Sequence, residues 1–71
     1  DLLGEMVRLA TNEGAKGHWH RVSEVKKDMN TIMAELIEFD FTGYLRTKYD
    51  QARNHLRKVE QMEYEVQLRK K

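Results

Sequence analysis

The sequence predicts an all-α fold: a helical hairpin or a three-helix bundle, in which a short N-terminal helix precedes an antiparallel, coiled-coil-like hairpin. Proline is absent, and charged residues make up 35% of the chain, so little favours strands or interrupts helices. In the two longer segments, apolar residues recur at alternating steps of three and four. The four glycines divide the chain. We expect one helical domain over residues 1–71.

The first segment, residues 2–11, is predicted to form a short helix. Asp1 stands where a negative charge suits the positive end of the helix dipole. A helix of about ten residues is not stable alone, since marginal helices need ~12–15 residues, so this one must dock on another element. Asn12, Gly14 and Gly17 predict a loop over 12–18. The apolar side of the helix consists of Leu2, Leu3, Met6, Leu9 and Ala10.

Two longer helices are predicted over 19–40 and 44–69, each with one apolar seam. Met33 and Ile37 widen the first seam into a stripe that can serve more than one neighbour. Glu63 interrupts the second seam, with Met62 beside it. The seams consist of Val22, Val25, Met29, Ile32, Leu36 and Phe39, and of Leu45, Tyr49, Ala52, Leu56, Val59 and Val66. Both helices therefore require a facing helix.

A turn at 41–43, with Gly43 as its hinge, is predicted between these helices. The first seam, continued unbroken, would reach Gly43 and Arg46, whereas the second seam starts at Leu45. Gly43 suits the left-handed position just past a helix end. A bend would also allow Phe39 and Phe41 both to point inward. The alternative is a straight rod, since a helical Gly43 costs only about 1 kcal/mol.

Charge favours the hairpin. Residues 1–43 contain five Lys and Arg against eight Asp and Glu, a net charge of −3, and residues 44–71 contain eight against four, a net charge of +4. Antiparallel packing would bring opposite charges together, although the register could slip by one heptad and Arg21 would face Arg69. The expected contacts are Lys26 with Glu60, Asp40 with Arg46, and Glu35 with His55.

No residue pattern predicts catalysis or a cofactor. Cysteine is absent, Ser23 is the single serine, and no glycine-rich phosphate loop is present. His18 and His20 form an H-x-H pair whose side chains diverge on a helix, and His55 lies on another segment. We therefore expect no metal site, no cofactor and no enzymatic activity.

Small size points to association with a partner. Single cores of this size rarely supply more than ~3–5 kcal/mol, so a partner chain is a common addition. We expect a non-catalytic assembly or scaffolding module that forms a homodimer or a hetero-oligomer by helical packing. Any exposed remainder of the stripes, chiefly Met33, Ile37, Met62 and Leu68, would meet the second chain. The predicted protein-interface residues are Val25, Met29, Ile32, Met33, Leu36, Ile37, Leu45, Tyr49, Leu56, Val59, Met62 and Val66.

Nucleic-acid binding is the alternative function. The third segment is basic, but the formal net charge of the chain is only +1. Its basic residues are Arg46, Lys48, Arg53, His55, Arg57 and Lys58, followed by Arg69, Lys70 and Lys71 at the end of the chain. A membrane partner is not expected, because no apolar run approaches the ~18 residues of a membrane span. The absence of cysteine fits the cytoplasm or the nucleus without deciding between compartments.

Overall fold

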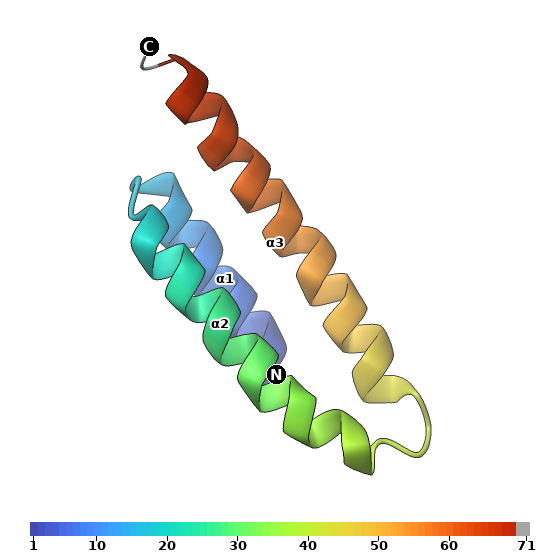
Figure 1. The fold of residues 1–71 in the computed structure, drawn as a ribbon. Helices are drawn as coiled ribbons and strands as arrows, with labels where there is room; N and C mark the ends of the chain where they lie inside the picture. Colours follow the sequence, from blue (N-terminus) through green and yellow to red (C-terminus); the bar gives the residue numbers. More distant parts are fainter. Residues whose placement is uncertain (70–71) are drawn as a thin grey trace.

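The computed structural model describes residues 1–69 and contains three α-helices. They are α1 (Leu2–Ala15), α2 (Trp19–Leu36) and α3 (Tyr44–Arg69), and a short 3-10 helix, η1 (Ile37–Phe39), follows α2 directly. The helices run lengthwise beside one another in an elongated bundle measuring 47 × 17 × 16 Å (Figure 1). No strand occurs in this part of the chain. The prediction of an all-α, three-helix fold is confirmed.

The first helix packs against both other helices. Its contacts with α2 and with α3 are more extensive than those between α2 and α3. Thus α1 contributes to the single core rather than docking on a completed hairpin, and the burial of its short apolar stripe stabilises a helix that would be marginal alone. The buried residues are Leu3, Ala10 and Gly14 from α1, Val22, Val25, Met29 and Met33 from α2, and Ala52, Leu56 and Val59 from α3.

The loop between α1 and α2 is shorter than predicted. The sequence placed a loop at 12–18, but α1 continues to Ala15 and includes Gly14. Gly17 ends the helix in a left-handed conformation, with φ of +79°. Its N–H donates to the Gly14 carbonyl at 3.0 Å, and the His18 N–H donates to the Glu13 carbonyl at 2.9 Å. This pair of bonds satisfies carbonyls at the helix end and stops α1.

The turn after α2 confirms the predicted hairpin and excludes the straight rod. Gly43 has a φ of +80°, a conformation that other residues rarely adopt. However, Gly43 directly precedes α3 instead of capping α2, since its carbonyl accepts the Thr47 N–H at 3.0 Å. The second helix was predicted to reach residue 40, but α2 ends at Leu36 and η1 carries the chain to Phe39. The third helix spans the residues 44–69 that were expected.

The prediction that both phenylalanines near the turn point inward is wrong. Phe39 is 72% exposed and Phe41 is 94% exposed. The connection between α2 and α3 lies beyond the N-terminal end of α1, so α1 does not reach far enough to cover these rings (Figure 1). The bend alone therefore does not bury them.

Polar contacts fix how α2 and α3 align. Lys26 Nζ lies 3.0 Å from Glu60 Oε1, which confirms the pairing expected from the sequence. The Tyr49 hydroxyl donates to Asn30 Oδ1 at 2.6 Å. Arg21, expected to face Arg69, instead contacts Glu13 of α1. Across residues 1–69, no helix combines the length and apolar character needed to cross a membrane.

Candidate functional site

The end of the bundle that contains the α2–α3 turn carries a group of exposed apolar side chains, called here the turn-end surface. Phe39 and Phe41 project from the segment between the helices, and Leu36 is 40% exposed. Exposed apolar patches of this kind often mark sites where another molecule binds. The turn-end surface consists of Leu2, Leu36, Phe39, Phe41 and Tyr44.

An apolar pocket of about 120 Å³ opens at the same end. Three of its lining residues, Leu2, Leu36 and Tyr44, belong to the turn-end surface, and Met33 and Leu3 form part of the wall. Asp1 and Lys48 also line the pocket and supply its charged groups. The Lys48 ammonium lies 5.7 Å from the centre of the Tyr44 ring, within the range of a cation–π contact.

Asp40 holds the turn that presents this surface. Its Oδ2 accepts the Arg46 N–H at 3.1 Å, and its Oδ1 accepts the Gly43 N–H at 3.1 Å and the Thr42 hydroxyl at 3.2 Å. Partial desolvation raises the pKa of the Asp40 carboxyl, but these donors outweigh it, so the pKa lies below its ordinary value. The charge pair predicted between Asp40 and Arg46 is not among the ion pairs of residues 1–69, because Asp40 accepts the backbone N–H of Arg46 instead. The carboxylate thereby satisfies N–H groups at the start of α3.

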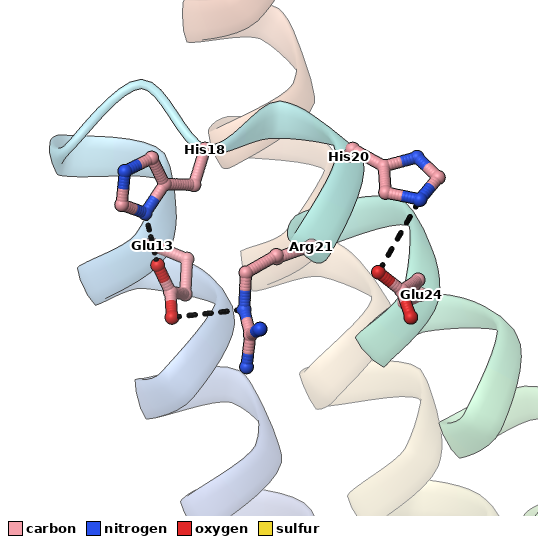
Figure 2. A network of polar contacts seen from close by, with 5 residues as sticks. All are labelled: Glu13, His18, His20, Arg21 and Glu24. Atoms are coloured by element: carbon pink, nitrogen blue, oxygen red, sulfur yellow. Dashed lines mark hydrogen bonds and ion pairs between the residues drawn. The ribbon is translucent and has the colours of Figure 1, made fainter.

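A polar network joins α1 to α2 at the opposite end of α2 (Figure 2). Glu13 Oε2 lies 2.7 Å from His18 Nδ1, and Glu13 Oε1 lies 3.2 Å from Arg21 Nε. The Glu13 side chain is only 13% exposed. The hydrogen bond from His18 lowers the pKa of the Glu13 carboxyl, partial burial raises it, and the charges of Arg21 and Lys16 lower it, with a net decrease. Glu13 of α1 therefore contacts both the start of α2 and the residue that precedes it, across the loop.

The H-x-H pair does not converge. His18 turns toward Glu13, whereas His20 turns away and lies 3.4 Å from Glu24 one helical turn further on (Figure 2). Within residues 1–69, no three His, Cys, Asp or Glu side chains are grouped as metal ligands.

A basic groove lies between α2 and α3. Two adjoining hollows share Lys26 and Glu60, which form the ion pair described above. Trp19 is in the wall of the larger hollow, and Leu56 is in the wall of the smaller one. The remaining charges of the groove are Lys27, Arg53 and Arg57 against Glu63. More basic than acidic side chains therefore line the groove, although the net charge of the whole chain is only +1.

The predicted interface residues differ in how deeply the fold buries them. Those that are buried or half-buried contribute to packing within one chain, so only the exposed ones are available to a partner in the folded monomer. Leu68, at 48% exposed, joins this exposed group, whereas Met33, expected to remain free, is 1% exposed. Val25, Met29, Met33, Leu56 and Val59 are buried, Ile32, Ile37, Leu45, Tyr49 and Val66 are half-buried, and Leu36 and Met62 are exposed.

Sequence reasoning missed the exposed rings and the Glu13 network. The rings were assigned to the interior because of their apolar character. A signal for the turn was present, since Asp40 and Thr42 are residue types that cap helix starts and both come just before Tyr44. The contact between Glu13 and His18 spans the loop and follows no helical spacing, so no periodic pattern could have identified it.

Comparison with known proteins identifies the family. No curated protein and no solved structure matches the chain. The family model described as "Translin family" matches residues 1–70, which is nearly the whole chain. The helical fold agrees with this match. The chain belongs to the Translin family.

Proposed function

We propose that the chain is a non-catalytic protein-interaction module that associates with a second copy of itself through the turn-end surface. The observation that supports this proposal is the exposure of Phe41 and Phe39, at 94% and 72%, in the segment between Leu36 and Tyr44, two residues that line the apolar pocket. Full burial of one phenylalanine side chain contributes about 1.5–3 kcal/mol, so a partner that covered both rings would gain appreciably. Membership of the Translin family supports a role in a larger assembly.

Internal packing supports the choice of this surface. The widened stripe of α2 and the seam of α3 are largely used within the chain, where Met29, Met33 and Leu56 are almost completely buried. The turn-end surface contains apolar side chains at the end of α2 and in the turn that α1 does not cover. Association there requires no unfolding of the bundle, so dimerization and scaffolding can use the fold as it stands.

Sedimentation velocity over a range of protein concentrations tests this proposal. The variant Leu36→Ser/Phe39→Ser/Phe41→Ser should remain monomeric at concentrations where the natural chain associates. Met62→Ser/Tyr64→Ser/Leu68→Ser is the matched control, because it removes as many exposed apolar side chains from the other end of α3. Equal association of both variants and the natural chain would show that the turn-end surface is not the contact.

Nucleic-acid binding is a second candidate function, favoured by the basic groove between α2 and α3. Lys27, Arg53 and Arg57 could contact phosphates, and Trp19 in the groove wall offers a ring for base stacking. Glu60 and Glu63 oppose this function, since both also line the groove.

Titration of a labelled single-stranded oligonucleotide at several salt concentrations tests the second candidate. Lys27→Gln/Arg53→Gln/Arg57→Gln should weaken binding and flatten its salt dependence, by about 0.7 in the logarithmic slope for each lost phosphate contact. Arg8→Gln/Lys16→Gln/Lys58→Gln is the control with the same charge change outside the groove. Equal loss in the two variants would indicate nonspecific attraction to the whole chain.

A further inference from the structure

We propose that the turn-end surface pairs in a defined way: the Phe41 ring of one copy inserts into the apolar pocket of the other, and the second Phe41 does the same in return. This inference rests on the proposed self-association and specifies its geometry. In a two-fold symmetric dimer both copies use the same surface. That surface must therefore carry both the inserting ring and the pocket that receives it.

Phe41 is the anchor because it has the least contact with its own chain. At 94% it is the most exposed large hydrophobic side chain among residues 1–69, so its own pocket does not hold it. It lies on the short connection between η1 and α3, where Asp40 fixes the backbone through Arg46 and Gly43. A ring presented on a fixed turn loses little conformational freedom when it binds, which favours it as a binding anchor.

The pocket suits a single aromatic ring in size and in lining. Its volume is about 120 Å³ and its walls are mainly apolar, formed by side chains such as Leu2, Met33, Leu36 and Leu45. For comparison, an engineered protein cavity of about 150 Å³ lined by similar side chains binds benzene. A phenyl group therefore matches this pocket better than a charged or extended group would.

A second copy is chosen as the occupant because this chain itself exposes a phenyl ring, Phe41, that matches the pocket, while the charges on the two sides of the contact are mixed. The segment that carries Phe41 is acidic, with the exposed Glu38 and with Asp40 on its N-terminal side. Lys48 and Asp1 both line the pocket. Insertion of Phe41 would thus bring the acidic segment of one copy toward Lys48 of the other, which is favourable, and toward Asp1, which is not. Such charges orient an interface and speed association more than they tighten it.

Two single substitutions in the full chain separate the anchor from the pocket. Phe41→Ala removes the ring, and Leu36→Trp fills the pocket while the surface stays apolar. Each should weaken self-association measured by sedimentation velocity at least about tenfold, since central aromatic anchors commonly account for such losses. Phe39→Ala is the matched control and should have a smaller effect, about threefold or less. Equal effects of Phe39→Ala and Phe41→Ala would overturn the inference.

A mixing experiment tests the pairing directly. The Phe41→Ala chain keeps an open pocket, and the Leu36→Trp chain keeps its Phe41 ring, so an equimolar mixture can restore one of the two contacts. We expect a one-to-one heterodimer that is tighter than either variant with itself, and circular dichroism should show that both variants remain helical. A mixture no tighter than its components overturns the inference. If the natural chain associates and Phe41→Ala does so equally well, self-association stands and the ring-in-pocket contact fails.

Discussion

Gly14 of α1 lies against Val59 of α3, so closely that a Cβ atom added at Gly14 would stand 2.9 Å from Val59 Cγ1. The same atom would stand 3.0 Å from Cζ3 of Trp19. Gly14 is therefore the point where α1 approaches both other helices without a side chain between them. The absence of a side chain there permits the close packing of a helix that is too short to be stable alone.

Gly14→Ala should destabilise the fold, although alanine is the better helix former by about 1 kcal/mol. Overpacking against Val59 and Trp19 costs about 1–3 kcal/mol, so we expect a net loss of up to ~2 kcal/mol in the free energy of unfolding. Chemical denaturation followed by circular dichroism measures it. Gly4→Ala is the control, since its Cβ would meet only the exposed carboxylate of Asp1, the N-cap of α1, and it should lose less stability than Gly14→Ala.

Gly17→Ala should also destabilise, for a different reason. No atom lies within 4 Å of a Cβ at Gly17, but its φ of +79° is unfavourable for a residue with a side chain. The left-handed conformation costs roughly 1–2 kcal/mol. Gly17→Asn should lose less, because asparagine adopts this conformation more readily. Equal stabilities of the alanine and asparagine variants would contradict this explanation.

The features that could be predicted from the sequence are those encoded by local pattern. The change of heptad phase before Leu45 predicted the reversal near Gly43, and opposite charges predicted the pairing of Lys26 with Glu60. Both depend on spacing along the chain, which periodicity reports directly. The structure contains the turn and the ion pair.

The features that the sequence did not predict depend on how α1 packs and where it begins. Gly14 was assigned to a loop because glycine disfavours helices, yet close contact with Val59 outweighs that propensity. Phe39 and Phe41 were expected inside because they are apolar, but α1 begins too far from the turn to cover them. Both the helical conformation of Gly14 and the exposure of the two rings depend on how the three helices pack. The spacing of apolar residues along the chain does not show which part of the bundle α1 covers.

The ion pair between Lys26 and Glu60 should contribute little to stability. The two side chains are 43% and 41% exposed, so water and salt screen their attraction. A double-mutant cycle with Lys26→Ala and Glu60→Ala should give a coupling energy of about 0.2–1 kcal/mol, smaller at high salt. Pairing Lys27→Ala with Glu60→Ala is the control and should show less coupling. A coupling above about 2 kcal/mol would mean that the pair is effectively desolvated.

Acid should weaken the fold through Glu13 and Asp40. The pKa of each carboxyl is lowered in the folded chain, so each contributes stability above its unfolded pKa, about 4.3 for Glu and 3.9 for Asp. That contribution is lost as the pH falls through the folded pKa, because the unfolded chain then binds protons more readily. Glu13→Gln and Asp40→Asn should therefore be less stable than the natural chain at pH 7, and the difference should shrink below about pH 4.

Denaturation at a series of pH values, followed by fluorescence of the single tryptophan, Trp19, provides the measurement. Trp19 contacts the Gly14 region, so its emission should report the release of α1 from the bundle. Asp28→Asn is the matched control, since Asp28 is exposed and makes no ion pair within residues 1–69. Its stability profile should run parallel to that of the natural chain. If Glu13→Gln also ran parallel, the carboxylate that joins His18 to Arg21 would contribute nothing to acid sensitivity.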